Sequence, residues 1–104
     1  MSDEPLTIYE VLQSTDLPCA YSHFRTPQEP PYLVYIGEGQ DVLDADNTHY
    51  WRENNYQVEY YFTEKNEANE TAIEDALLGE GFVYDKSEDV FIEDEGVFVI
   101  YYHV

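Results

Sequence analysis

Carboxylates are the most abundant side chains in this chain that could do chemistry. Asp and Glu account for 23 of the 104 residues, against four Lys and Arg. The best candidate for metal binding is DVLDADN at residues 41–47, within an expected acidic loop at residues 40–47. A Ca²⁺-binding EF-hand loop that opens at Asp44 would need Gly at position 49 and Glu at position 55, where the chain has His49 and Asn55. The motif is therefore absent, and weak Ca²⁺ binding by the acidic loop is the only metal chemistry left open.

The other reactive side chains are scattered along the chain. His23, His49 and His103 form no paired-ligand motif such as HExxH. Cys19 has no assignable triad partner, so we expect a buried, inert thiol, and one cysteine cannot form an intrachain disulfide. The chain has no GxSxG, and GEG at residues 37–39 lacks the Lys and the following helix of a phosphate loop. We therefore predict a non-enzyme without catalytic residues, metal ions or cofactors.

The most aromatic stretch is HYWRENNYQVEYYF at residues 49–62. Alternate positions place Tyr56, Val58, Tyr60 and Phe62 on one face, which is the period of a strand with one buried side. Aromatic platforms for single-stranded nucleic acid interleave their rings with Arg or Lys, and this stretch has one Arg among acidic neighbours. We therefore interpret it as a long, central strand whose aromatic row belongs to the core.

The remaining candidates are residues for contacts with partners. Trp51 and Tyr61 fall on the face of the strand opposite the core row, so they are candidates for contact with a neighbouring subunit. A second candidate group consists of acidic side chains near the end of the chain. Its members are Asp85, Glu88, Asp89, Glu93, Asp94 and Glu95.

The first half of the chain predicts one helix and two strands before the aromatic stretch. Thr7 and Glu10 have the spacing of a capping box, and the helix that they open is followed by Pro18. Strands are expected at residues 20–24 and 32–36, separated by a proline-rich link at 26–31. The glycines at 37 and 39 are expected to end the second strand.

The second half predicts a helix followed by three short strands. Asn66 or Asn69 can cap the helix, and Gly79 and Gly81 can end it. Strands are expected at residues 82–85, 90–93 and 97–104, with a turn at 94–96. The fold class is therefore α+β: one domain over residues 1–104, with residues 1–6 flexible and the order α-β-β-β-α-β-β-β. We expect a mainly antiparallel sheet with two helices on one face.

The net charge of −19 excludes whole classes of partner. Binding to nucleic-acid phosphates requires a basic footprint, which the four basic residues do not provide. An anionic membrane surface is disfavoured for the same reason, and no apolar stretch approaches the length of a membrane span. The N-terminal sequence has no signal-peptide pattern, so we expect a protein folded in a cytoplasm.

Four stretches together resemble a known family. They are TIYEVLQSTDLPCAYSHF, PPYLVYIGEGQ, ADNTHYWRENNYQVEYYF and AIEDALLGEGFVYDKSED. Over residues 7–104 the chain resembles small structural proteins from the head–tail modules of tailed bacteriophages and prophages, of the tail-completion or tail-terminator type. The resemblance implies an α+β subunit of a ring, typically six-fold, at the head-proximal end of the tail. It also implies tail and connector proteins as partners, and a location in the host cytoplasm during assembly and then in the virion.

A protein of another class would explain the charge as well. A DNA-mimic inhibitor places carboxylates at phosphate-like spacing and blocks a basic nuclease, such as a restriction or CRISPR enzyme. The six late acids above would form such a face together with earlier ones, namely Glu64, Glu67, Glu70, Glu74 and Asp75. The two hypotheses differ in salt dependence, because salt weakens a mimic's binding and helps acidic subunits to associate.

Overall fold

The computed structural model describes the backbone of residues 7–45 and 49–104, and the side chains of residues 7–39 and 55–104. The expected flexibility of residues 1–6 concerns residues outside this range. The elements are α1 (Ile8–Gln13), β1 (Cys19–Tyr21), β2 (Tyr32–Ala45), β3 (His49–Phe62), α2 (Glu67–Gly79), β4 (Asp85–Lys86), β5 (Val90–Ile92) and β6 (Val97–His103). Their order confirms the predicted α-β-β-β-α-β-β-β.

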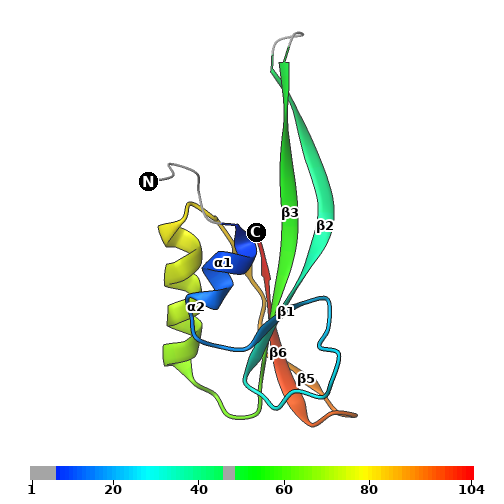
Figure 1. Ribbon diagram of the computed structural model, residues 1–104, viewed down its shortest axis with the longest axis vertical. Helices are drawn as coiled ribbons and strands as arrows, with labels where there is room; N and C mark the ends of the chain where they lie inside the picture. The colour runs from blue at the N-terminus through cyan, green and yellow to red at the C-terminus, as the bar shows by residue number, and fades with distance from the viewer. Residues whose placement is uncertain (1–6, 46–48) are drawn as a thin grey trace.

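The strands form one mixed sheet in the order β1-β2-β3-β6-β4, with β5 also paired to β6. Only the β1–β2 pair is parallel among the described strands, and the other pairs are antiparallel. Both helices lie on one face of the sheet (Figure 1). The α+β class with a mainly antiparallel sheet is confirmed, and β3 is the central strand that its sequence predicted.

Local sequence signals account for both ends of the helices. The Thr7 side chain accepts a hydrogen bond from the Glu10 amide and Glu10 reaches back to Thr7, which is the predicted capping box. Of the two possible caps of α2, Asn66 is used, and its Oδ1 accepts from the Asn69 amide at 3.2 Å. At the other end Gly81 has a positive φ of 84° and follows the last turn, as a helix-ending glycine should.

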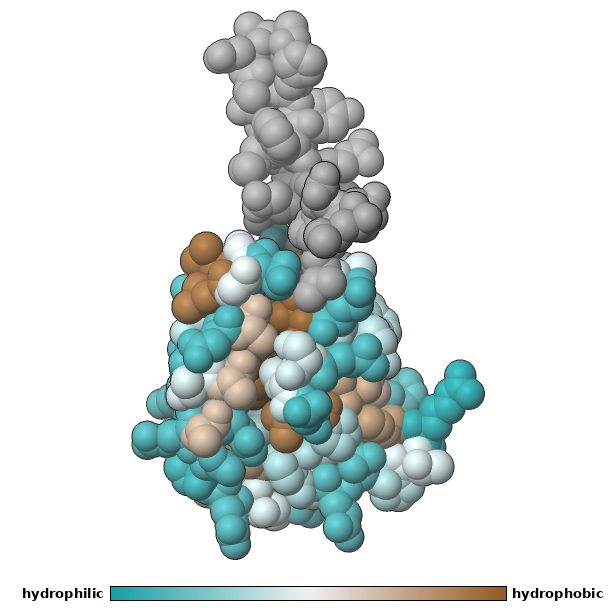
Figure 2. Space-filling model, turned by 60° about the vertical axis from the view of Figure 1, so that its left-hand side comes forward, coloured by the Kyte–Doolittle hydropathy of each residue, from teal (hydrophilic) through white to brown (hydrophobic). Residues whose placement is uncertain are grey.

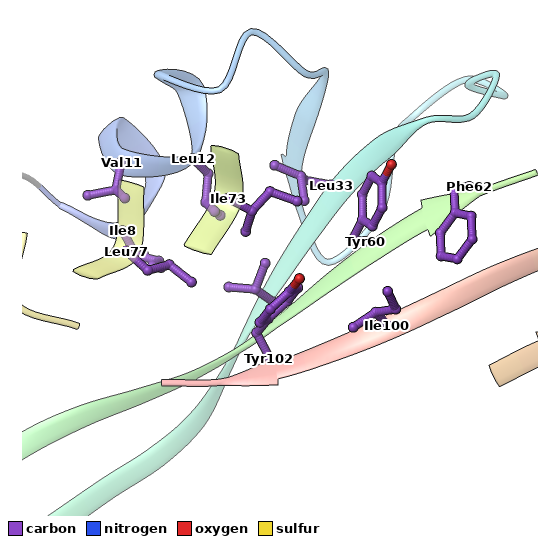
Figure 3. Close-up of a cluster of buried hydrophobic side chains, with 11 residues drawn as sticks. Ile8, Val11, Leu12, Leu33, Tyr60, Phe62, Ile73, Leu77, Ile100 and Tyr102 are labelled. Atoms are coloured by element: carbon purple, nitrogen blue, oxygen red, sulfur yellow. The ribbon is translucent and has the colours of Figure 1, made fainter. Parts of the chain in front are cut away.

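The core lies between the helices and one face of the sheet (Figure 3). In β3 the side chains of Val58, Tyr60 and Phe62 are buried and Tyr56 is half-buried, so the predicted core row is confirmed. The apolar residues packed around that row come from both helices and from β2 and β6. They are Ile8, Val11, Leu12, Leu33, Ile73, Leu77, Ile100 and Tyr102.

The predicted acidic loop at residues 40–47 is wrong over its described part, because β2 runs on through residues 40–45 as a strand. The glycines expected to end β2 instead form a bulge. Gly37 pairs with Tyr56 and Gly39 pairs with Asn55, so Glu38 is the extra residue. Gly39 has a φ of 97°, which a glycine adopts without strain. Residues 46 and 47 of the predicted loop lie outside the described residues.

The bulge carries the β2–β3 hairpin beyond the rest of the sheet. We call residues 37–45 and 49–55 the arm; it projects away from the helices and from β6 (Figure 1). β1 pairs with β2 only at residues 33–35, and β6 pairs with β3 only at residues 57–62. Within the described chain, no further strand pairs with either outer edge of the arm.

Two predicted strands are clearly shorter in the structure than in the sequence analysis. β1 stops at Tyr21 instead of residue 24, because Ser22 adopts a left-handed φ of 68° that breaks the extended conformation. The strand expected at residues 82–85 is replaced by β4, which consists of Asp85 and Lys86 and overlaps the expected range only at Asp85. Between β4 and β5 the Ser87 hydroxyl accepts from the Tyr101 amide at 2.9 Å, in place of a regular ladder bond. The predicted strands 90–93 and 97–104 correspond to β5 and β6.

Candidate functional site

Two lysines bind a group of acidic side chains beside α2. Lys86 Nζ lies 2.9 Å from Glu70 Oε1 and 2.8 Å from Glu74 Oε2. Lys65 Nζ lies 2.9 Å from Glu70 Oε2 and 3.0 Å from Asp89 Oδ2. Glu70 is buried with 4% of its surface exposed, so these ammonium groups replace the water that its charge has lost.

The pKa values of this network show that its ion pairs favour the charged forms. Burial alone would raise the pKa of Glu70, but the bonds from Lys65 and Lys86 outweigh it and hold that pKa below its ordinary 4.5. The pKa of Glu74 is lowered in the same way, against burial, by Lys86 and by the Tyr102 hydroxyl, which donates to Glu74 Oε2 at 2.8 Å. Burial would lower the pKa of Lys86, yet Glu74 and Glu70 raise it. The network therefore joins α2 to β4 and β6.

The acids proposed for a DNA-mimic face fall into two groups, those that contact a lysine and those that are exposed without such a contact in the described structure. Glu70, Glu74 and Asp89 face lysine ammonium groups, so they do not present bare carboxylates to a partner. The other proposed acids of that face are exposed. They are Glu64, Glu67, Asp75, Asp85, Glu88, Glu93, Asp94 and Glu95. The face over the helices is mostly hydrophilic, with only small separate apolar patches (Figure 2).

The predicted contact residue Tyr61 lies on the sheet face opposite the helices. Its ring stacks on Tyr32, with the ring centroids 4.9 Å apart, and Phe24 packs edge-on against Tyr32 at 5.3 Å. The Tyr61 hydroxyl donates to Glu59 Oε1 at 2.5 Å. Burial, followed by that bond and the charge of Glu59, raises the pKa of Tyr61, so its hydroxyl stays protonated. Tyr61 is half-buried, and the stack on Tyr32 and the hydrogen bond to Glu59 hold its side chain in position.

A groove of about 410 Å³ opens beside this stack. One wall is the segment after β1, from Ser22 to Gln28, which includes His23, Phe24 and Arg25. The floor is the outer face of β2 and β3, with Tyr32, Val34 and Tyr61, and Glu95 from the turn before β6 completes the lining. Tyr61 and Glu95 were both predicted as contact residues, and the structure brings them to one groove.

The sequence analysis missed the other groove residues, chiefly Phe24, Arg25 and Tyr32. It placed Phe24 and Tyr32 in strands and assigned Arg25 to no element, although a signal was available. From residue 17 to residue 37 the chain has one acid, Glu29, and one base, Arg25, in a protein of net charge −19. A segment of that length without net charge, in so acidic a chain, indicates a part of the surface that differs in charge from the rest.

Trp51, the other predicted aromatic contact, lies on the arm. Its backbone pairs with Leu43, well beyond the last residue of β3 that pairs with β6. The side chain of Trp51 is outside the described residues. Ten residues of strand separate Trp51 from Tyr61, or about 33 Å at the usual rise of a strand. The two residues therefore cannot belong to one contact patch on a single subunit.

A cluster of tyrosines that the sequence analysis did not predict supports the root of the arm. The Tyr35 ring contacts Tyr21 at 5.1 Å, Tyr9 at 6.0 Å and Tyr56 at 6.2 Å between centroids. On β6, His103 Nδ1 lies 2.8 Å from Glu38 Oε1, the carboxylate of the bulge residue. The arm thus leaves the domain from a packed base.

Two properties of the reactive side chains can be stated for the described residues. No three His, Cys, Asp or Glu side chains among them gather closely enough to hold a metal ion. Burial raises the pKa of the half-buried Cys19 thiol to about 11, so it is a poor nucleophile at neutral pH. Among the described residues, no helix is both long enough and apolar enough to cross a membrane.

Comparison with protein-family models and with curated protein sequences finds no match for this chain. The features that bear on its function are therefore the arm, the groove and the distribution of charge.

Proposed function

We propose that this protein is a non-enzymatic structural subunit that joins its neighbours through the arm. The observation that carries the proposal is a long two-stranded ribbon whose two outer edges pair with no other strand in the described part of the chain. An isolated ribbon is only marginally stable in water, and unpaired edges are sites for pairing with other chains. Such a ribbon gains stability when a neighbouring chain covers it, so assembly would account for its length.

The resemblance to phage head–tail proteins predicts where this assembly would form. The subunit would form or join a ring at the head-proximal end of a phage tail, in contact with tail and connector proteins. A closed ring limits its own growth, which suits a protein that completes a tube. Neither catalysis nor direct binding to nucleic acid is required of it, and an acidic surface would not retain DNA phosphates that pass by.

Salt should control self-association in a characteristic direction. Subunits of charge −19 repel one another, and screening shortens the range of that repulsion from about 14 Å at 0.05 M salt to about 3 Å at 1 M. We expect sedimentation velocity to find monomers at the lower salt concentration and a discrete oligomer at the higher one. A monomer at every salt and protein concentration would contradict assembly through this chain alone.

The place in the particle is tested by counting copies. Quantitative mass spectrometry of purified phage particles from a strain that carries this gene should find a few copies per particle, near the number in one ring. Absence from particles, together with abundance in the cytoplasm, would exclude the head–tail role.

A second candidate function, inhibition of a basic nuclease by DNA mimicry, rests on a separate observation. The exposed acids Glu93, Asp94 and Glu95 lie in the turn before β6, at the end of the molecule opposite the arm (Figure 1). A mimic should bind a basic nuclease with an affinity that falls steeply as salt rises, the reverse of the trend expected for assembly.

A further inference from the structure

The charge of this molecule is distributed very unevenly. Residues 64–95 carry twelve acids against Lys65 and Lys86, whereas residues 17–37 carry only Glu29 and Arg25. Two copies that meet through acidic surfaces must overcome like-charge repulsion, and two that meet at a neutral surface avoid most of it. The neutral segment forms β1, the wall of the groove and the first part of β2.

The groove has the chemistry of a protein-binding surface within this neutral region. Phe24, Tyr32 and Tyr61 give it aromatic walls, and aromatic residues are enriched in the cores of protein interfaces. The stack on Tyr32 and the Glu59 bond fix Tyr61, so little side-chain entropy remains to be lost on binding. Arg25 adds a positive charge, and Glu95 is the acidic residue of the lining.

We propose that this groove receives the arm of a second copy of the chain, an inference that rests on the proposed assembly function. The arm carries the acids Glu38, Asp41, Asp44 and Glu53 against one base, Arg52, so its charge complements Arg25. Its sequence also contains large apolar residues, namely Leu43, Tyr50 and Trp51.

Geometry requires that donor and acceptor be different copies. The arm leaves the domain in the direction away from the groove, and about 33 Å of straight strand separates Trp51 from Tyr61. The nine residues from 37 to 45 span about 30 Å, comparable with the 33 and 27 Å shorter extents of the molecule. An arm can therefore reach across a neighbour. Because the two surfaces differ, copies can join head-to-tail, an arrangement that forms a ring when the rotation between copies closes.

Photo-crosslinking tests this contact directly. Tyr50 is replaced by p-benzoylphenylalanine in ¹⁵N-labelled full-length chain, which is mixed with unlabelled wild type at high salt and irradiated. We expect crosslinked peptides that join position 50 of the labelled copy to residues 22–32 or to the Tyr61 region of the unlabelled copy. Crosslinks to another surface of the second copy would overturn the groove assignment and leave assembly standing. A mixture that stays monomeric would overturn both proposals.

A pair of charge-matched variants gives an independent readout. Arg25→Ala and Thr71→Glu each make the net charge more negative by one unit, the first by loss of a positive charge in the groove and the second by gain of a negative charge on the exposed face of α2. We expect Arg25→Ala to weaken self-association about fivefold or more, as the loss of an ion pair would. Thr71→Glu should change it by less than about twofold at high salt. Equal effects would mean that only net charge matters, and would overturn the groove assignment.

Discussion

At the residue scale, contact with a lysine distinguishes the few acids that help to hold the fold together from the many that are only exposed. Lys65 and Lys86 contact Glu70, Glu74 and Asp89 across α2, β4 and the segment before β5. A buried pair is strongly destabilised when one partner is removed, because the other charge is left without water. The network therefore identifies Glu70 as the carboxylate on which folding depends most.

Replacement of Glu70 by Gln should destabilise the protein in a pH-dependent way. The pKa of Glu70 is lowered from 4.5 in the folded state, so its stabilising contribution is fully present above that value. The contribution is lost as pH falls through the lower folded pKa. We expect Glu70→Gln to cost about 1–3 kcal/mol at pH 7 and much less at pH 3, as measured by urea unfolding.

The control is Asp75→Asn, which removes one negative charge from an exposed position on the same helix. It should leave the stability unchanged or raise it slightly, because it reduces self-repulsion. If the two variants responded alike at both pH values, the network would have no special role.

At the element scale, the bulge at residues 37–39 converts an ordinary hairpin into an arm. Two glycines near the middle of β2 allow Glu38 to be accommodated as an extra residue without ending the strand. The Glu38–His103 contact and the tyrosine cluster then hold the point at which the arm leaves the sheet. The arm is anchored at its base. Further out, residues 49–55 of β3 pair with β2 and with no other described strand.

Trp51→Ala should therefore affect association more than folding. Trp51 pairs with Leu43 within the arm, six residues before the first β3 residue that pairs with β6. Loss of one cross-strand pair costs about 0.2–1 kcal/mol, and among the described strands the backbone of this part of β3 pairs only with β2. We expect a small change in Tm and a clear loss of oligomer in sedimentation velocity. A large fall in Tm with association unchanged would refute this role for Trp51.

At the scale of the whole molecule, charge and shape are both polarised. Residues 64–95, which include α2, β4 and β5, carry twelve acids, whereas residues 17–37, which include β1, carry one acid and one base. A uniformly acidic sphere would resist every approach of another copy. A neutral groove on one side and a long arm at one end allow approach in a single orientation.

Removal of the arm should separate folding from assembly. Residues 40–54 can be replaced by Asn-Gly, which joins Gly39 to its partner Asn55 through a two-residue hairpin turn. Because residues 40–45 and 49–54 pair only with each other among the described strands, the free energy of unfolding should stay within about 1 kcal/mol of the wild type. The shortened protein should remain monomeric at the salt concentration at which the wild type associates. An oligomer that survives the deletion would show that the arm is dispensable.

The sequence by itself determined the features that depend on neighbours along the chain. The Thr7–Glu10 capping box, the stop of α2 at its glycines and the alternation of residues 49–62 are local patterns with local causes, and each corresponds to the element it predicted. The core row of β3 followed from that alternation, because a strand at the centre of a sheet buries every second side chain.

Only the tertiary structure decided the features that depend on pairing between distant segments. Glycines in a strand are compatible with the end of the strand or with a bulge. Here the strand continues with a bulge, because residues 49–56 of β3 pair with β2 on both sides of Glu38. The parallel β1–β2 pair and the groove beside it require residues 19–28, 32–34, 61 and 95 to meet in space. The same holds for the acids, since no spacing along the chain reveals that Lys65 and Lys86 converge on Glu70, and only the packing of α2 against the sheet brings them together.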